Sequence, residues 1–330
     1  MALQKICKKC VLPESGLDIV LNEDGICNIC VDFQNQNTQN QDSALLESEL
    51  IKILNKYKAK SQYDCLVMCS GGKDSTLSLY YMKRRYKMNP LAFTFDHGFE
   101  NEEALKNIRN AVNILNIDWI YYKSETMKDI FAQIIKSRTK APICHVCAIW
   151  YLGLTHDLAA RYNIPLIVAG WTKGQSLRGK ETGVEYKSMS KSTEDFVKNY
   201  LRKNPKYEDF PISIKEVLDK ARKRFKSCAI SPHWFCQYDH EKMKEILERE
   251  LKWEAPKLSY PRGSTNCLMN FANVYLSMKN YGYTHYHIEM SKLVRLGEMS
   301  REEALNILEI GFDEQFVNSI LNKIDCSLDN

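Results

Sequence analysis

Six residues, Ser70–Ser75, constrain the fold of this chain more than any other part of its sequence. The segment SGGKDS follows an apolar run, Asp64–Cys69, that is predicted to be a strand, and it leads into a predicted helix over Asp74–Tyr86. Gly71 and Gly72 let backbone N–H groups approach an anion without hindrance from a Cβ atom, and the helix N-terminus adds the positive end of its dipole. The sequence therefore predicts a phosphate-binding loop.

The side chains of this loop suit a nucleotide with its metal ion. Ser70 and Ser75 offer hydroxyl groups to phosphate oxygens, and Lys73 offers a positive charge. Asp74, in the first turn, favours the start of the helix and can help to hold Mg²⁺. The pattern differs from the Walker loop, GxxxxGK[ST]. An ordinary strand-to-helix turn is disfavoured because the motif is complete and correctly placed between strand and helix.

Strands and helices are predicted to alternate after this loop. Further strands are predicted at Leu91–Phe95, Trp119–Tyr122 and Pro165–Ala169, with helices over Glu102–Leu115 and Ala148–Tyr162. Such alternation predicts an α/β fold with a doubly wound parallel sheet. Open sheets of this kind bind ligands at the carboxyl ends of their strands, which is where the phosphate loop lies.

Four cysteines near the N-terminus have the spacing of a metal site. Cys7 and Cys10 form one CxxC pair, and Cys27 and Cys30 form a second pair after sixteen residues. Each pair can present two thiolates to one zinc ion, and the few apolar residues between the pairs mean that metal would contribute much of the folding free energy. Asn22–Gly25 predicts a hairpin turn before the second pair. A structural Zn²⁺ is expected here rather than a catalytic one.

The chain is expected to divide into four regions. An insertion that is part helix and part mobile loop is expected from Thr172 to about Lys226, and Ser300 with Glu303 predicts a capping box at the start of a late helix. The regions are a zinc-binding ribbon at 1–31, a polar linker and a helix over Ala44–Lys58 at 32–60, the nucleotide-binding domain with its insertion at 61–225, and a mainly helical part at 226–330.

Composition narrows the class of protein. The chain has twelve cysteines, and its N-terminus, MALQKICKKC, lacks the apolar core of a signal peptide, so metal binding or catalysis is favoured over a disulfide framework. No run approaches the length of about 20 apolar residues that a membrane span needs. The protein is therefore expected to lie in the cytoplasm and not in a membrane. A net charge of +5 suits an anionic substrate, a nucleotide or a nucleic acid without choosing among them.

The loop SGGKDS after a strand resembles the PP-loop of the ATP-pyrophosphatases, whose fold is adenine nucleotide alpha hydrolase-like. The resemblance implies cleavage of ATP between the α and β phosphates, with AMP left on a substrate oxygen. It also implies that adenosine lies on the ends of neighbouring strands, which in this chain are marked by Met68, Phe95, Asp96 and Gly170. Many members continue from the last of these positions with Gly-His-x-x-Asp-Asp. This chain has Gly-Trp-Thr-Lys-Gly-Gln over 170–175, which argues against an ordinary tRNA-modifying member.

A closer resemblance rests on three segments together. CKKCVLPESGLDIVLNEDGICNIC at 7–30, SGGKDS at 70–75 and SKLVRLGEMSREEAL at 291–305 are similar to the N-acetyl sugar amidotransferases of bacterial surface-sugar pathways. That resemblance implies conversion of an acetamido group to an acetamidino group on an N-acetylated sugar. Because no glutaminase motif is visible in the chain, ammonia is expected from a partner glutaminase.

Three central cysteines leave a second interpretation open. Cys144 and Cys147 form a CxxC pair before a predicted helix, and Cys267 follows much later. In order and context they are similar to the cysteines of tRNA thiolation enzymes that hold a [4Fe–4S] cluster or form a persulfide, which would make sulfide from a donor protein the nucleophile and tRNA or a small molecule the acceptor. Cys228 and Cys236 compete for the third position. A second zinc, or buried cysteines without metal, are further alternatives.

A third interpretation belongs to a different class of protein. A zinc-containing protein that binds nucleic acid without catalysis would use the basic stretch Lys220–Lys226. A run of charges is usually a solvated helix face, and the intact phosphate loop speaks against a pure binding protein. Release of pyrophosphate from ATP would separate this interpretation from the two enzymes.

Overall fold

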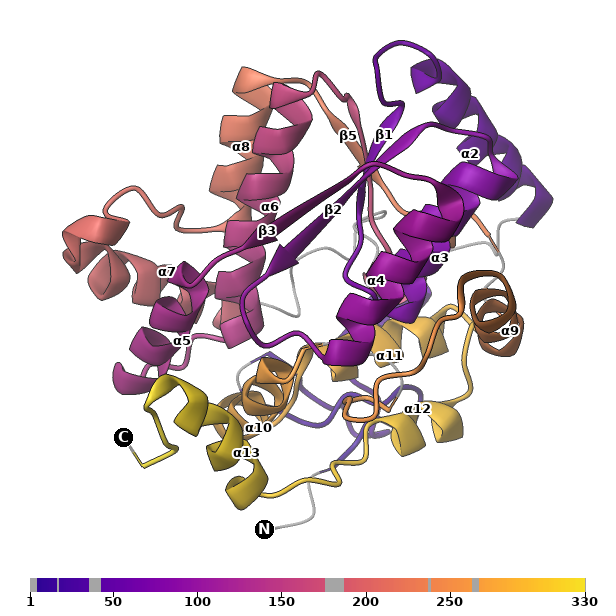
Figure 1. Cartoon of the computed structure of the whole chain (residues 1–330). Coiled ribbons are helices and arrows are strands. Elements are labelled where there is room, and N and C mark those ends of the chain that lie inside the picture. The colour runs from indigo at the N-terminus through magenta and orange to yellow at the C-terminus, as the bar shows by residue number, and fades with distance from the viewer. Residues whose placement is uncertain are drawn as a thin grey trace.

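A parallel five-stranded sheet organises the computed structural model, which describes residues 5–16, 18–35, 43–175, 187–236, 239–262 and 267–329. The strand order is β3-β2-β1-β4-β5 (Figure 1), so the order reverses between β1 and β4. This arrangement confirms the doubly wound parallel sheet, and it puts the ligand crevice beside the carboxyl end of β1. The strands are β1 (Cys65–Met68), β2 (Pro90–Asp96), β3 (Trp119–Lys123), β4 (Leu166–Val168) and β5 (Cys228–Ile230).

Helices cover both faces of the sheet because its buried strands alternate between two layers. In β1, Cys65 and Val67 pack in one cluster with residues of α2, α3, α4 and α9, whereas Leu66 packs with Ala159 of α6 on the other face. The first layer consists of α2 (Ser43–Tyr57), α3 (Lys73–Tyr80) continued by a π-turn at Tyr81–Arg85, α4 (Glu102–Leu115) and α9 (His240–Leu251). The second face carries α5 (Thr126–Lys136), α6 (Ile143–Arg161) and α8 (Ile214–Arg224).

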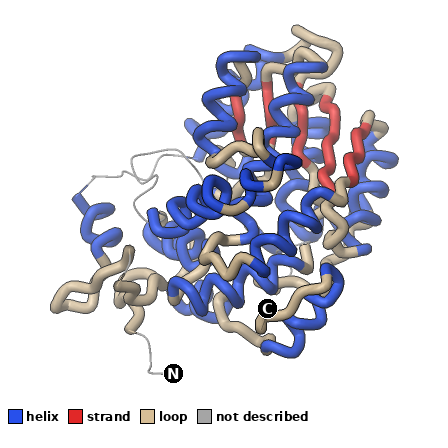
Figure 2. The backbone as a smooth tube through the Cα atoms, turned by 90° about the vertical axis from the view of Figure 1, so that its left-hand side faces the viewer, coloured by secondary structure: helices blue, strands red, loops and turns tan. Residues whose placement is uncertain are grey.

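A helical C-terminal part lies beyond the carboxyl ends of the strands, as Figure 2 shows below the red strands. Ser300 caps α12, because its side chain accepts a hydrogen bond from the Glu303 N–H at 3.1 Å. The expected helical character of this part is confirmed. Its helices are α10 (Met269–Tyr281), α11 (His285–Arg295), α12 (Arg301–Ile307) and α13 (Glu314–Leu321).

Several elements differ from the sequence-based predictions. The short fifth strand and α5 were not predicted, and α6 begins at Ile143 rather than Ala148, directly after Pro142, whose fixed φ suits a helix start. The predicted linker is partly helical, since α1 spans Asn28–Asn35. The insertion contains α7 (Lys187–Asn199) and α8, and the remaining short turns are at Lys173–Gln175, Leu201–Lys203, Pro205–Tyr207, Pro232–Trp234 and Asn322–Ile324. Residues 176–186 of the predicted insertion, and residues 263–266 before Cys267, lie outside the described residues.

One helix of the described chain, α6, is long and apolar enough to cross a membrane by length and composition. Core helices of folded domains pass the same test, and α6 packs against α5, α7, α8 and α10. Its inward side chains, such as Val146 and Ile149, belong to the largest apolar cluster of the protein. About a third of this apolar stretch is buried in the core of the fold.

The four N-terminal cysteines converge as predicted. The Sγ atoms of Cys10 and Cys27 are 3.7 Å apart, those of Cys7 and Cys30 are 3.9 Å apart, and all four lie within 4.8 Å of one another. A tetrahedral zinc with Zn–S bonds of about 2.3 Å requires sulfurs about 3.8 Å apart. The donor set and its geometry therefore fit one zinc ion, which would hold the two CxxC turns together.

The cysteine cluster is fastened to the C-terminal helices. The Arg301 guanidinium of α12 donates hydrogen bonds to the carbonyl oxygens of Cys7 and Cys10 at 2.9–3.2 Å. Tyr283, fully buried beside the cysteines, donates to Asp18 at 2.6 Å. The N-terminal segment thus supports the far end of the chain.

We expect Cys10→Ser to lower the zinc content from about one ion per chain towards zero, because a tetrahedral site loses one of its four ligands. Elemental analysis measures the zinc, and limited proteolysis near residues 5–35 measures local unfolding. Cys228→Ser is the matched control, since Cys228 lies in β5 away from the cluster. Full zinc binding by Cys10→Ser would contradict the assignment.

Candidate active site at the phosphate loop

The phosphate loop, Ser70–Ser75, has a backbone that only glycine can adopt at its second position. Gly71 has a φ of +78°, and a Cβ atom there would lie 2.1 Å from the carbonyl oxygen of Ala104 in α4. The Gly71 carbonyl accepts hydrogen bonds from Trp253 Nε1 at 2.9 Å and from Asn107 Nδ2 at 3.3 Å. The loop is therefore held directly against α4.

The end of β4 approaches the loop from the other side. A Cβ atom on Gly170 would lie 2.4 Å from the backbone nitrogen of Ser75. Within the loop, the Ser75 hydroxyl oxygen accepts from the Ser70 N–H at 3.1 Å and lies 3.0 Å from the Ser70 hydroxyl. Gly170, predicted to follow the fourth strand, thus borders the start of α3, where the backbone N–H groups of a helix N-terminus can bind an anion.

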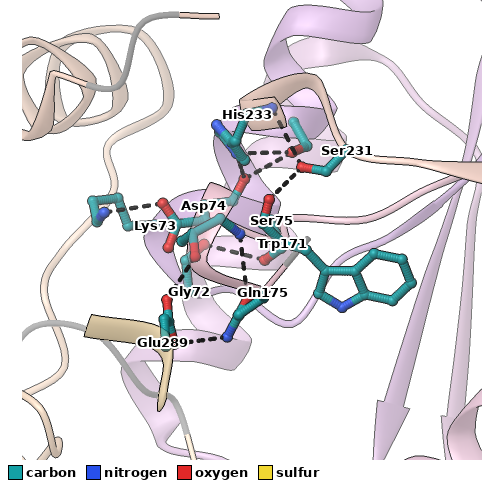
Figure 3. Close-up of polar contacts among 11 residues, drawn as sticks. Gly72, Lys73, Asp74, Ser75, Trp171, Gln175, Ser231, His233 and Glu289 are labelled. Atoms are coloured by element: carbon teal, nitrogen blue, oxygen red, sulfur yellow. Dashed lines mark hydrogen bonds and ion pairs between the residues drawn. The ribbon is translucent and has the colours of Figure 1, made fainter. Parts of the chain in front are cut away.

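Figure 3 shows the polar contacts that fix the first turn of α3. Lys73 Nζ forms an ion pair with Asp74 Oδ1 at 2.9 Å. His233 Nε2 donates to the Asp74 carbonyl oxygen at 2.9 Å and lies 3.1 Å from the Ser78 hydroxyl. Burial lowers the pKa of His233, so a neutral imidazole supports the turn.

A cavity of about 380 Å³ opens between the loop and the C-terminal helices. Its wall contains backbone and side chains from the carboxyl ends of β1, β2 and β4, from α6 and from α11. The predicted site residues that line it are Met68, Ser70, Gly72, Asp74, Ser75, Phe95, Cys144, Cys147, Gly170 and Cys267.

Three predicted residues lie outside the cavity wall. Gly71 packs against α4, and the Lys73 ammonium group points to Asp74 rather than into the cavity. The Asp96 carboxylate accepts hydrogen bonds from the Gly98 N–H and from the Tyr121 hydroxyl. Asp96 therefore shapes the turn after β2 instead of facing the cavity.

The central cysteines come together at this cavity. Cys144 and Cys147 lie in the first turns of α6, and not before the helix as predicted. Cys267 joins them because its backbone pairs with Glu100 after β2. Burial raises the pKa of Cys144 to about 12, so the apolar wall favours the protonated thiol in the absence of a metal.

The competing cysteines are excluded from the cavity by their positions. Cys228 lies in β5, and the Cys236 sulfur lies 3.4 Å from the Tyr86 hydroxyl; neither lines the cavity. Cys267 is therefore the third cysteine of the group. The three sulfurs are not all within 4.8 Å of one another, unlike those of the N-terminal cluster. Their spacing is wider than one tetrahedral zinc requires.

The prediction missed an imidazole and a carboxylate beside Cys267. His97 Nε2 lies 3.2 Å from Glu100 Oε1 and 3.5 Å from Cys267 Sγ, while His97 Nδ1 accepts from the Phe99 N–H at 3.3 Å. The proton of the ring therefore resides on Nε2. Burial lowers the pKa of His97 to about 4, which keeps the ring neutral. Their place directly after the second strand was the available signal.

The prediction also missed Glu289, which α11 brings into the cavity wall. Thr172 Oγ1 donates to one carboxylate oxygen at 2.6 Å, and Gln175 Nε2 donates to the other at 3.0 Å. Burial raises the pKa of Glu289 to about 7. Nothing local in the sequence marks this residue, because it meets the loop only through tertiary packing.

Comparison with known proteins finds a family match in the C-terminal part of the chain. Residues 265–330 match the family described as LPS biosynthesis protein WbpG-like, C-terminal domain. The match supports the resemblance to surface-sugar enzymes for this region, which contributes Cys267 and Glu289 to the cavity. An uncharacterised protein of Methanocaldococcus jannaschii is 26% identical over 282 residues, which cover 85% of each chain.

Two solved structures are similar over most of the chain. One is the U34-tRNA thiolase NcsA from Methanococcus maripaludis with its [4Fe–4S] cluster, at 17% identity, 94% coverage of this chain, 93% of that chain and a TM-score of 0.38. The other is the NMN synthetase from Francisella tularensis, at 12% identity, 87% coverage of this chain, 98% of that chain and a TM-score of 0.41.

We expect Gly170→Ala to weaken ATP binding at least about tenfold, because the added methyl group must displace the Ser75 backbone, and 1.4 kcal/mol suffices for that factor. Gly153→Ala in α6 is the control, since its Cβ would meet nothing within 4 Å and a helical Gly→Ala change stabilises by about 0.5–1 kcal/mol. Calorimetric titration with ATP measures binding, and thermal unfolding measures stability. Equal affinities of the two variants for ATP would contradict a role for the close contact between Gly170 and the Ser75 backbone.

Proposed function

We propose that the protein is an ATP-pyrophosphatase that adenylates the amide oxygen of an N-acetylated sugar and then replaces that oxygen with ammonia. The observation that carries the proposal is the phosphate loop, which opens onto a cavity closed by a WbpG-like C-terminal domain. The product would be an acetamidino sugar for a bacterial surface polysaccharide. The nucleophile would come from a partner glutaminase.

The loop would hold the β and γ phosphates of ATP at the start of α3. Backbone N–H groups after Gly72 and the hydroxyls of Ser70 and Ser75 are the available donors. Asp74 would help to hold Mg²⁺ between phosphate oxygens, since carboxylate and phosphate oxygens are its preferred ligands. The amide oxygen attacks the α phosphorus, pyrophosphate leaves, and the adenylated carbon becomes open to nitrogen.

Asp74→Asn is expected to reduce acceptor-dependent pyrophosphate release about 100-fold or more, because a preorganised contact to the reacting phosphates is lost. Asp157→Asn, a neutralisation at an exposed ion pair with Arg224, is the matched control. The assay contains ATP, Mg²⁺, an ammonium salt and candidate N-acetyl sugars. The wild-type product should be about one mass unit lighter than the acceptor, since NH replaces oxygen. Normal turnover by Asp74→Asn would refute the site.

Sulfur insertion is the second candidate function, favoured by the three cysteines on the cavity wall. Cys144, Cys147 and Cys267 offer thiolates to a cluster wider than a single zinc, with one iron open to sulfide. A bound [4Fe–4S] cluster would supply a Lewis-acidic iron for sulfide beside the adenylated carbon. The acceptor in that case would be tRNA or a small molecule, and the product would be heavier through exchange of oxygen for sulfur.

Iron content decides between these candidates. Sulfur insertion predicts about four irons per chain after anaerobic purification, with loss of iron and of visible absorbance in Cys267→Ser but not in Cys236→Ser. The ammonia reaction predicts instead that amidine formation continues in iron-free protein. If iron-free protein inserted sulfur at the full rate, the cluster would have no part in sulfur insertion.

A further inference from the structure

Glu289 is a buried carboxylate that faces the cavity next to the phosphate loop. Its residue is 6% exposed, and it lines the same cavity as Asp74 and Ser75. Figure 3 shows its carboxylate turned towards Gln175. Thr172 and Gln175 donate hydrogen bonds to it at 2.6 and 3.0 Å. Both donors are neutral, and they leave lone pairs on each oxygen for a further partner.

The segment after β4 is built closely around this carboxylate. A Cβ atom on Gly174 would lie 2.6 Å from the Glu289 carbonyl oxygen and 2.7 Å from its Cγ atom. Thr172 and Gln175 flank this contact. The backbone between them packs against α11, and their side chains orient the Glu289 carboxylate. The unusual Trp-Thr-Lys-Gly-Gln sequence after Gly170 thus has a stereochemical reason: it positions a carboxylate that comes from the C-terminal region.

Amidine formation needs a base at this point of the reaction. When ammonia adds to the adenylated carbon, the new C–N bond leaves the nitrogen as –NH3⁺, which departs more readily than AMP. Removal of one proton from that nitrogen keeps the C–N bond, and the C–O bond to AMP then breaks with its electron pair on AMP. Hydrosulfide already carries a negative charge when it attacks, so its adduct has no cationic leaving group that must first be deprotonated, and sulfur insertion makes a weaker demand on a base.

Asp74, His97 and Glu100, which also line the cavity, are committed to different contacts. Asp74 forms an ion pair with Lys73 at 2.9 Å. The His97 ring carries its proton on Nε2, and its unprotonated nitrogen, Nδ1, accepts a hydrogen bond from the Phe99 N–H. That nitrogen is therefore occupied and does not face the substrate as a base. Glu100 is bound to that same Nε2 at 3.2 Å. Glu289 differs from these groups because the hydrogen bonds described for it come only from uncharged donors.

Resting on the function proposed above, we propose that Glu289 is the general base of the second half-reaction, which takes the surplus proton from the attacking nitrogen before AMP departs. The acceptor of the proton is a carboxylate oxygen, and the proton leaves to water after the products are released. Adenylation itself does not require this group. Glu289 thereby keeps the adduct from losing ammonia and returning to the adenylated sugar.

The electrostatic surroundings agree with this role. The pKa of Glu289 is raised to about 7, mainly by burial and also by the nearby Asp74 charge, while the hydrogen bonds from Thr172 and Gln175 and the Lys73 charge lower it in part. Lys173, near Gln175, is paired with Glu298, and on α11 itself burial lowers the pKa of His285 to about 3. His287 on the same helix has its pKa lowered to about 4. The base form of Glu289 is the deprotonated one, so amidination should decline as the pH falls through about 7.

The test compares Glu289→Gln with wild-type enzyme and with Glu298→Gln, which removes one charge at a partly exposed ion pair. Each protein receives ATP, Mg²⁺ and the N-acetyl sugar acceptor, at a constant concentration of free ammonia from pH 6 to 9. Pyrophosphate release without ammonia reports adenylation, and amidine formed per AMP reports the second half-reaction. Thermal unfolding shows whether each variant is folded.

We expect Glu289→Gln to keep pyrophosphate release within about twofold and to lower amidine per AMP about 100-fold, the size of a lost general base. Its amidination should also lose the decline below pH 7, while Glu298→Gln behaves as wild type. Glu289→Asp, which keeps a carboxylate, should retain that pH dependence at a reduced rate, and it carries the test if the glutamine variant fails to fold.

Equal loss of pyrophosphate release and amidine in Glu289→Gln would overturn the proposal, because it would show a structural or phosphate-binding role. An unchanged pH profile would overturn it as well. Failure of the proposed function has a different signature: wild-type enzyme would then form no amidine at any pH, whether or not it released pyrophosphate.

Discussion

The site depends on two backbone approaches that leave no room for a Cβ atom. Gly71 touches α4, and Gly170 touches the start of α3, so the phosphate loop is clamped between a helix and the end of a strand. Close packing of this kind fixes N–H groups before any nucleotide arrives, which avoids their reorganisation during the reaction. Everything else in the cavity is arranged relative to this clamp.

The C-terminal helices complete what the sheet begins. The backbone of Cys267 pairs with Glu100 just after β2, and the Leu268 N–H donates to the Phe99 carbonyl at 2.8 Å. The N-terminal cysteine cluster then braces these helices through Arg301. Two segments from opposite ends of the chain therefore stabilise a cavity that neither of them forms alone. The N-terminal cysteine cluster thus supports a site whose residues are distant from it in the sequence.

The sheet and the loop could be predicted from the sequence because their signals are local. Apolar runs, glycine positions and CxxC spacing each act within a few residues. The short strand β5 escaped prediction, since Cys228–Ile230 is too brief to show alternation and gains its place only by pairing with β4. Glu289 escaped for a related reason: its partners Thr172 and Gln175 are distant in sequence. The order of the three cysteines along the sequence could suggest that they lie close together, but the distances between their sulfurs could be known only from the fold.

The division of the cavity between the middle and the end of the chain has a consequence during synthesis. A ribosome-bound chain that has emerged only as far as β5 contains the whole phosphate loop but lacks Cys267, Tyr286 and Glu289. Such a nascent chain would present the loop to solvent, with no wall to enclose an acceptor. The cavity is therefore complete only when translation has delivered the last helices of the chain.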